Sequence, residues 1–318
     1  MTLPRFHASN AAKSDSIFPM TTKQILLLFG YTVLFVGSVA AMLWWQKRQR
    51  KTRTPFGDDL RLMRTAGESQ LKHVLKFDED AFLWVIMAGS APVLLGVLGV
   101  MATTLLPATL QWAGLALSGA LFVVMFILSA GWFAGKTAES HNRYLGYFGE
   151  RMVAEHLDAL KGQGWRVFHD VPGTDKGRKF NVDHVAVGPP GVFVVETKTR
   201  RKGRARPGFE SHKVYFDGHS LVWPWGEDNH GLEQAEHNAQ WLADLLQAEL
   251  RESVPVIPFL TLPGWFVEMK PAQNPRACRV TNPKGLDRFL PNGAAVLSSH
   301  QIAAIAVKLE ELCRDVEY

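Results

Sequence analysis

The chain has 318 residues, of which 47% are hydrophobic, and its formal net charge is +5. This length allows about two domains, and the composition excludes wholesale disorder, collagen and a long coiled coil. The positive excess is confined to the first part of the chain: residues 1–135 hold 12 Lys and Arg against 7 Asp and Glu, whereas residues 136–318 hold 23 of each. The net charge therefore does not by itself indicate a nucleic-acid-binding protein.

Three uncharged apolar runs lie in that first part, each long enough to cross a bilayer as a helix. They hold 21, 23 and 25 residues and predict transmembrane helices at about 25–45, 82–104 and 110–134. Tryptophans stand near the ends of the runs, as in an interfacial aromatic belt. The first run is too long for a signal peptide and ends in two tryptophans and a basic cluster, so it is interpreted as a retained anchor.

Lysine and arginine in the connecting segments predict the orientation of these helices. Loop 46–81 holds nine of them, the N-terminal tail 1–24 holds three, and the turn 105–109 holds none. The positive-inside rule then places loop 46–81 in the cytoplasm. We expect a multi-pass protein of the cell inner membrane, with the N-terminal tail outside and everything from residue 136 onward in the cytoplasm. The basic cluster is interpreted as a topology signal and not as a nucleic-acid site.

The second part of the chain, residues 136–318, alternates helix and strand patterns. Its two cysteines, Cys278 and Cys313, lie 35 positions apart without partner histidine motifs, so we expect reduced thiols. The predicted elements are, in order, a helix at 144–161, strands at 165–171, 179–187 and 191–198, a hairpin at 214–216 and 220–223, a helix at 231–250, strands at 254–260, 265–269 and 279–281, and helices at 283–290 and 298–314. This order predicts an α/β fold in which helices flank a mixed β-sheet.

The second and third of these strands form a predicted hairpin that brings acidic residues together. If Pro189 and Pro190 are the two turn residues, the register places Asp183 directly opposite Glu196 on one face of the sheet. Lys198 stands two positions beyond Glu196 and shares that face. The register is an assumption, because Pro-Pro is not a preferred two-residue turn and a slip of one position would separate the faces.

Two opposed carboxylates destabilise a sheet unless a cation compensates them, and Mg²⁺ takes carboxylate oxygens. Lys198 could then position a water molecule or neutralise charge on a phosphate. This combination is the chemistry of metal-assisted phosphodiester hydrolysis. The alternative is an Asp at the start of one strand and a Glu-x-Lys at the end of another, both merely solvated. Burial favours the first interpretation, because Glu196 follows an apolar run typical of a core strand.

The stretch from about residue 144 to 246 resembles the nuclease-related domain (NERD) family, within the PD-(D/E)xK nuclease-like superfamily. The resemblance rests on Gly149-Glu150 in the opening helix, Val182-Asp183-His184 before an apolar strand, Gly191-Val192-Phe193-Val194-Val195-Glu196-Thr197-Lys198, and Gln234 on the later helix. It implies a restriction-endonuclease-like α-β-β-β-α-β core over about residues 144–260, followed by an extension of strands and helices. The three apolar helices are not part of the family motif.

The resemblance also implies roles for individual residues. Asp183 and Glu196 would bind Mg²⁺ or Mn²⁺, and Lys198 would be catalytic. Glu150 would add a metal or water contact, and Gln234 would be a neighbour of the active site.

Three helix residues have a second interpretation. On its pattern alone, Glu150 is about equally well explained as a solvated helix residue. Gln234 and Asn238 stand one turn apart on one helix face, and an exposed polar stripe is the favoured interpretation of that pair. His184, next to Asp183, points to the opposite face of the strand and is expected to be structural.

A basic run follows the acidic pair and predicts a phosphate-binding patch. The predicted nucleic-acid-binding residues are Arg200, Arg201, Lys202, Arg204 and Arg206. A solvated flexible loop, or a loop at anionic lipid headgroups, explains the same pattern. Aromatic residues that follow the run could stack on bases, although packing in the domain is their more common use; they are Tyr215, Trp223 and Trp225.

The sequence therefore predicts a membrane-anchored, metal-dependent nuclease that hydrolyses DNA or RNA at the cytoplasmic face. A non-catalytic scaffold of the same fold, tethered to the lipid bilayer and binding nucleic acid or protein, is the alternative. A third interpretation is a membrane protein whose soluble domain only regulates assembly.

Overall fold

The computed structural model describes residues 22–52, 60–273 and 275–317. They divide into two compact units, which are considered separately below. One unit contains the described residues up to 52 together with residues 82–134, and the other contains residues 60–81 together with 135–317. The N-terminal tail up to residue 21, and residues 53–59 of the predicted loop, lie outside the described residues.

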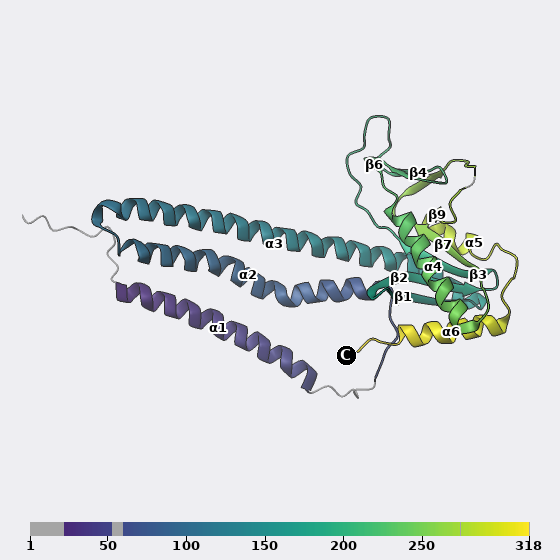
Figure 1. Ribbon diagram of the computed structural model, residues 1–318, viewed down its shortest axis with the longest axis horizontal. Coiled ribbons are helices and arrows are strands. Elements are labelled where there is room, and N and C mark those ends of the chain that lie inside the picture. Colours follow the sequence, from purple (N-terminus) through teal and green to yellow (C-terminus); the bar gives the residue numbers. More distant parts are fainter. Residues whose placement is uncertain (1–21, 53–59, 274, 318) are drawn as a thin grey trace, which may run out of the picture. The chain divides into compact units, whose positions relative to one another are not determined.

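Three long helices contain the apolar runs (Figure 1), and each is long and apolar enough to span a membrane. Their bounds are α1 Thr22–Thr52, α2 Glu68–Thr103 and α3 Ala108–Asp158. Where α2 and α3 pack together, small residues permit a close approach, since a Cβ on Gly99 would lie 2.6 Å from the Ser118 hydroxyl oxygen.

The helix α3 is longer than its apolar run and differs from the prediction. The run at 110–134 and the amphipathic segment at 144–161 form one continuous helix, which a short 3₁₀ turn (η1, Ala159–Gln163) and Gly164 end. No glycine or proline lies between Lys136 and Arg143. Glu139 also lies 3.2 Å from the Lys136 ammonium and 3.1 Å from the Arg143 guanidinium, at helical spacing. The helix therefore continues through this polar stretch.

The second unit is built on a five-stranded mixed sheet in the order β1-β2-β3-β7-β9. Strands β1, β2 and β3 are antiparallel, whereas β3, β7 and β9 run parallel. The strand bounds are β1 Arg166–Asp175, β2 Arg178–Gly188, β3 Gly191–Thr197, β7 Val256–Thr261 and β9 Arg279–Thr281. Every residue of β3 is buried, as predicted for a core strand.

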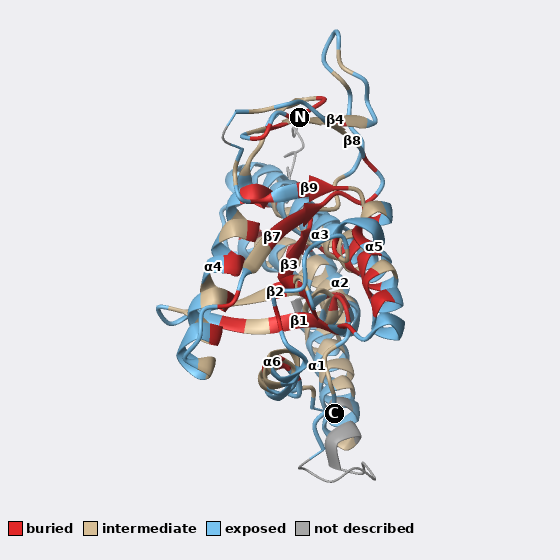
Figure 2. Ribbon diagram, turned by 90° about the vertical axis from the view of Figure 1, so that its right-hand side faces the viewer, coloured by how far each residue is buried: buried red, intermediate tan, exposed pale blue. Residues whose placement is uncertain are grey.

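Helices cover both faces of this sheet, and Figure 2 shows α4 and α5 on opposite sides of the buried strands β3 and β7. On one face the valines of β2 and β3 pack against α4 and α6. On the other face Phe193, Val195 and Phe259 pack against the C-terminal part of α3 and against α5. The covering helices are α4 His230–Leu250, α5 Leu286–Phe289 with the preceding 3₁₀ turn η2 Pro283–Gly285, and α6 Ser299–Cys313. The predicted mixed α/β fold is confirmed.

The remaining strands form a second sheet, whereas the sequence predicted a single sheet. Its order is β6-β5-β4-β8, with bounds β4 Lys213–Phe216, β5 Leu221–Trp223, β6 Gly226–Glu227 and β8 Phe266–Met269. The predicted β4–β5 hairpin is confirmed. Strand β8 leaves β7 through a turn in which Gly264 has φ +77°, and it pairs with β4. Strand β6 has two residues and is too short to leave a pattern in the sequence.

The connection between the first two long helices is shorter than the predicted loop 46–81. Helix α1 continues to Thr52 and α2 begins at Glu68. Between them, Leu62 forms a β-bridge with Val316 near the C-terminus, with backbone hydrogen bonds of 3.0 and 3.1 Å. Part of this connection therefore packs as a piece of the α/β unit.

Candidate functional site

The β2–β3 hairpin has the predicted register. Gly188 pairs with Gly191 and His184 pairs with Val195, so the next position places Asp183 across from Glu196. An Asp183 carboxylate oxygen also accepts the backbone N–H of Thr197 over 2.7 Å. The Pro-Pro turn is tolerated partly because its Pro189 carbonyl accepts two backbone N–H groups from the segment before α6, over 2.8 and 2.9 Å.

Lys198 lies between Glu196 of strand β3 and Gln234 of helix α4. Its Nζ lies 2.9 Å from Glu196 Oε1 and 2.8 Å from Gln234 Oε1. Burial alone would lower the pKa of Lys198, but the charges of Glu196 and Asp183, and the hydrogen bond that Lys198 donates to Glu196, raise this pKa above its ordinary value. The lysine is therefore held as a cation.

Two amides of α4 complete this arrangement. Asn238 is buried and its Nδ2 donates to Glu196 Oε2 over 3.1 Å, while Gln234, one turn earlier, accepts from Lys198. The interpretation of this pair as an exposed polar stripe, which the sequence favoured, is therefore wrong. Gly231 allows the helix to approach, because a Cβ there would lie 3.0 Å from the Lys198 Cγ atom.

Glu150 reaches the same region from α3. It is 5% exposed, and its Oε2 atom has no hydrogen-bond partner among the described residues. Burial, followed by the charges of Asp170 and Glu196, raises the pKa of Glu150 to about 8. Its neighbour Gly149 has no room for a side chain, since a Cβ would fall 1.7 Å from the Thr199 hydroxyl oxygen. The interpretation of Glu150 as a solvated helix residue is therefore wrong.

Burial raises the pKa values of the acidic groups of the site. Asp183 is partly exposed as a residue, but protein atoms surround its carboxylate; this burial raises its pKa, and the charges of Glu196 and Glu150 raise it further. Burial also raises the pKa of Glu196, against the opposing effects of Lys198 and Asn238. In the part of the chain that the structure describes, no group of three or more His, Cys, Asp and Glu side chains could hold a metal ion.

The basic run forms an irregular connection between β3 and β4. Arg200 is partly buried, pairs with Asp228 and lies 4.9 Å from the centre of the Trp223 ring. The other predicted phosphate-binding residues are exposed: Arg201, Lys202, Arg204 and Arg206. Of the aromatic residues that could stack on bases, Trp223 is buried in the core of the second sheet, whereas Trp225 and Tyr215 are half-buried.

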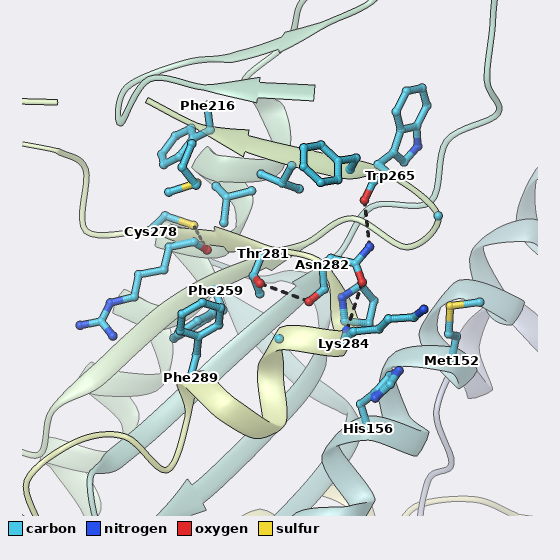
Figure 3. Close-up of a pocket in the computed structure, with 18 of the residues that line it drawn as sticks. Met152, His156, Phe216, Phe259, Trp265, Cys278, Thr281, Asn282, Lys284 and Phe289 are labelled. Atoms are coloured by element: carbon cyan, nitrogen blue, oxygen red, sulfur yellow. Dashed lines mark hydrogen bonds between the residues drawn. The ribbon is translucent and has the colours of Figure 1, made fainter. Parts of the chain in front are cut away.

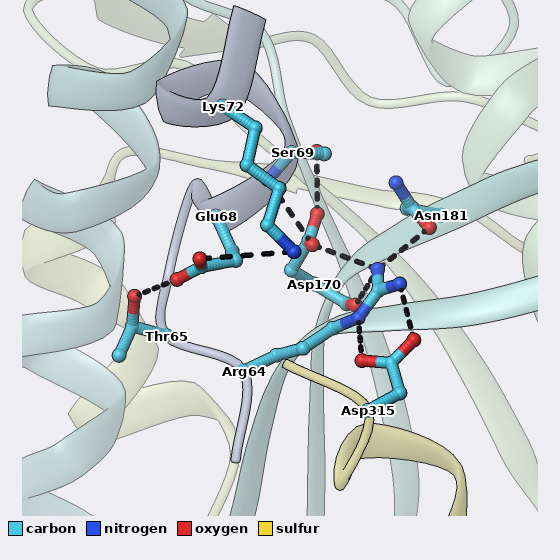
Figure 4. A network of polar contacts seen from close by, with 8 residues as sticks. All are labelled: Arg64, Thr65, Glu68, Ser69, Lys72, Asp170, Asn181 and Asp315. Carbon is cyan, nitrogen blue, oxygen red and sulfur yellow. Dashed lines mark hydrogen bonds and ion pairs between the residues drawn. The ribbon is translucent and has the colours of Figure 1, made fainter. Parts of the chain in front are cut away.

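An ionic network that the sequence did not reveal joins residues 60–72 to the α/β unit (Figure 4). The Arg64 guanidinium donates two hydrogen bonds to Asp315 and further ones to Asp170 and Asn181. Ser69, at the start of α2, donates to both carboxylate oxygens of Asp170. Next to this network, the Gly67 backbone lowers the pKa of Glu150, against the larger effect of burial. The connection between α1 and α2 thus reaches a residue of the candidate site.

Two sequence signals could have indicated this network. Asp170 interrupts an apolar strand, and a buried carboxylate requires a partner. The segment from Thr65 to Glu68 has the Thr-x-x-Glu pattern that begins a helix, and the Thr65 hydroxyl donates to Glu68 over 2.7 Å.

The two histidines next to the site lie on the other face of the sheet, as expected for His184. Its Nδ1 lies 2.9 Å from the His169 Nδ1, and His169 in turn contacts Asp158 over 3.0 Å. Both cysteines are buried, and neither forms a disulfide.

Comparison with known proteins agrees with this geometry. Residues 145–263 match the family model described as nuclease-related domain, NERD. The matched range contains the Asp183–Glu196 hairpin, Lys198, Glu150 and Gln234, and it excludes the apolar spans of the three long helices. No curated protein and no solved structure matches the chain. The chain therefore carries a NERD domain over residues 145–263, which begins in the last part of α3 and follows the apolar spans of three helices that could cross a membrane.

Proposed function

We propose that this domain is a metal-dependent nuclease that hydrolyses phosphodiester bonds of DNA or RNA. One observation carries the proposal: the Lys198 ammonium is held by Glu196 and Gln234 beside Asp183. A cation, two carboxylates and an amide at the open end of a hairpin suit a reaction in which negative charge develops on a phosphate. The match to a nuclease-related family supports the same class of reaction.

The acidic pair is a plausible Mg²⁺ or Mn²⁺ site. Mg²⁺ is commonly held by one or two carboxylates, with water and substrate phosphate filling its other positions, so it does not need three protein ligands. Asp183 and Glu196 would hold the ion. The buried Oε2 atom of Glu150, which has no partner among the described residues, supports the binding of a further polar group nearby. When bound, the ion would polarise a phosphate oxygen and lower the pKa of bound water.

The protein's own groups would orient the reaction. An ammonium carries three N–H donors, and two of them on Lys198 bond to Glu196 and Gln234. The third would donate to a water molecule or to a phosphate oxygen. In hydrolysis the water oxygen bonds to phosphorus, the bond from phosphorus to the leaving sugar oxygen breaks, and that oxygen takes up a proton. The exposed cations after β3 would contact the neighbouring phosphates.

A cleavage assay on the full chain in a non-ionic detergent tests this proposal. Plasmid, linear duplex, single-stranded DNA and RNA are incubated with Mg²⁺, with Mn²⁺ or with EDTA. Lys198→Met and Asp183→Asn should each reduce cleavage by about 100-fold or more, while Lys179→Met, at an exposed position on β2, should not. Cleavage that survives both site substitutions overturns the assignment. Binding of nucleic acid by the wild type without any cleavage supports the scaffold instead.

We further propose that α1, α2 and α3 anchor this domain in the cell inner membrane, with the N-terminus outside and the domain in the cytoplasm. The pairing of Leu62 with Val316 supports one part of this arrangement, because two paired segments lie on the same side of a bilayer. The nine basic residues of loop 46–81 then favour the cytoplasmic side.

Labelling with a membrane-impermeant maleimide tests the orientation. The native Cys278 and Cys313 are buried and should react little. In spheroplasts Leu105→Cys, between α2 and α3, should be labelled, and Lys179→Cys should be labelled only after lysis. The reverse pattern overturns the orientation.

A further inference from the structure

A second site lies away from the acidic hairpin, in a cavity of about 1320 Å³. Its walls come from the C-terminal part of α3, from β7, β8 and β9, and from η2 and α5. Figure 3 shows Phe216 of the second sheet on one side of this space and Phe259 and Phe289 on the other, with Met152 and His156 of α3 nearby. None of the acidic residues of the candidate nuclease site lines the cavity.

The walls of the cavity are largely apolar and partly exposed. Phe266 and Met269 are each 56% exposed and Phe289 is 52% exposed. Covering apolar surface contributes roughly 25 cal/mol per Å², so an apolar ligand that fills this space would be stabilised by the same side chains that water now contacts. Met152 and Met269 add flexible side chains that adapt to an irregular apolar body.

The charged side chains that line the cavity, among the described residues, are all cationic. Four cationic side chains line it, and among the described lining residues there is no Asp or Glu; the cations are Lys202, Arg276, Arg279 and Lys284. Arg276 bonds to Glu236 outside the lining, whereas Lys202 and Arg279 lie over the Trp265 and Phe259 rings. Lys284 is exposed. The rim therefore suits a ligand with an anionic group.

Three neutral polar side chains of the lining, Thr281, Asn282 and Trp265, are already bonded within the protein. The Asn282 side chain donates to the Trp265 carbonyl and accepts the Lys284 N–H, and the Thr281 hydroxyl donates to the Asn282 carbonyl. The Trp265 indole N–H donates to the Arg200 carbonyl. These three side chains are therefore less available to read the edge of a nucleobase, and the lining favours an apolar body over a base.

We propose that this cavity binds an amphipathic anion, namely a single acyl chain that ends in a carboxylate or a phosphate. The chain lies against the exposed Phe266, Met269 and Phe289, and the head group lies at Lys284. The proposal is independent of nuclease activity, because it concerns other residues. A fatty acid and a lysophospholipid share this chemistry, and competition distinguishes them.

Photolabelling of the full chain in phosphatidylcholine nanodiscs tests the site. The probe is a C16 fatty acid with a diazirine in its chain, and peptide mass spectrometry locates the adducts. Adducts are expected in residues 264–289 and should be displaced by oleate or lysophosphatidic acid, whichever head group is preferred. Oleyl alcohol, which lacks the charge, should displace them far less.

Two variants and a matched control sharpen the result. Ala277→Trp, at an exposed lining position, fills the cavity and should reduce labelling of this region about fivefold or more. Lys284→Glu should reduce it about fivefold, the effect of losing one favourable charge contact. Lys179→Glu, exposed and outside the cavity, should leave it unchanged. The proposal is overturned if neither cavity variant reduces the labelling of this region. It is also overturned if oleyl alcohol or an oligonucleotide displaces the probe as well as oleate does.

Discussion

The guanidinium of Arg64 lies 2.9 Å from a carboxylate oxygen of Asp170, a residue 106 positions later in the chain. Both side chains are largely buried, with 14% and 2% of their surface exposed. A connection whose basic charge first indicated only membrane topology therefore contributes to the core of the α/β unit. The unit that carries the candidate site is assembled from chain segments on both sides of residues 82–134.

Removing the Arg64 side chain should destabilise this unit strongly. Arg64→Ala leaves the buried Asp170 carboxylate without its cation, and breaking a buried pair from one side costs about 3 kcal/mol. Hydrogen exchange of β1 amides in the full chain measures the loss. Arg61→Ala is the matched control, because Arg61 pairs with Glu317 at the surface, where an ion pair contributes less than about 1 kcal/mol. Equal effects of the two substitutions would contradict a buried anchoring role for Arg64.

A methyl group at position 149 should separate α3 from the chain that follows β3. Gly→Ala inside a helix normally stabilises by about 1 kcal/mol, but here the Cβ would fall 1.7 Å from the Thr199 hydroxyl oxygen. Gly149→Ala should therefore lower the melting temperature, and Thr199→Gly should partly restore it in the double variant. Gly146→Ala is the control, since its nearest neighbour would lie 3.9 Å away. A stabilised Gly149→Ala protein would show that the helix has room to shift.

Local patterns in the sequence predicted most of the fold. Apolar alternation and turn residues identify strands without knowledge of their partners, and the two-residue turn at Pro189 and Pro190 fixes the register that opposes Asp183 and Glu196. The site residues that come from one hairpin were therefore predictable together. The division into two sheets was not, because pairing of β8 with β4 joins segments about 50 residues apart.

Residues that reach the site from other elements were harder to predict. A helix pattern shows that Gln234 and Asn238 share a face, but not that this face borders a strand end. The same limit applies to Arg64, whose partners lie in β1 and near the C-terminus. In each case the residue's role depends on a contact between segments that are far apart in the chain, and a single sequence does not show which distant segments are in contact.

Asn238 should hold Glu196 in place. Asn238→Ala removes the donor to a carboxylate that is 1% exposed, which costs about 1–3 kcal/mol of stability or of correct positioning. If the domain is a nuclease, we expect cleavage to fall about tenfold or more while nucleic-acid binding is kept. Gln240→Ala is the control, because that amide bonds only to Asp244 within the same helix among the contacts described. Unchanged cleavage by Asn238→Ala would contradict a positioning role.

The contact between Asp158 and His169 should make stability depend on acid pH. The hydrogen bond from His169 lowers the pKa of Asp158 to about 2, from an ordinary value of 3.8. Between these values the unfolded chain binds more protons, so the contribution is present above about pH 4 and is lost as the pH falls toward 2. Asp158→Asn should make the midpoint of urea unfolding depend less on pH over this range. Since the Asp158 side chain is 46% exposed, high salt should weaken this pH dependence. If the urea midpoint of Asp158→Asn changed with pH as much as that of the wild type, this role of Asp158 would be contradicted.

The exposed cations after β3 should set the salt dependence of nucleic-acid binding. Arg201 and Arg204 are exposed, whereas Arg200 is engaged by Asp228. Each phosphate contact contributes about 0.9 to the slope of log affinity against log salt on duplex DNA. The double substitution of Arg201 and Arg204 by Ala should therefore weaken binding for all sequences alike and reduce that slope by about 1.8, as measured by fluorescence anisotropy. Arg178→Ala, an exposed cation on β2, should change neither quantity. If the double variant keeps the wild-type slope, the run is a solvated loop and the phosphates are bound elsewhere.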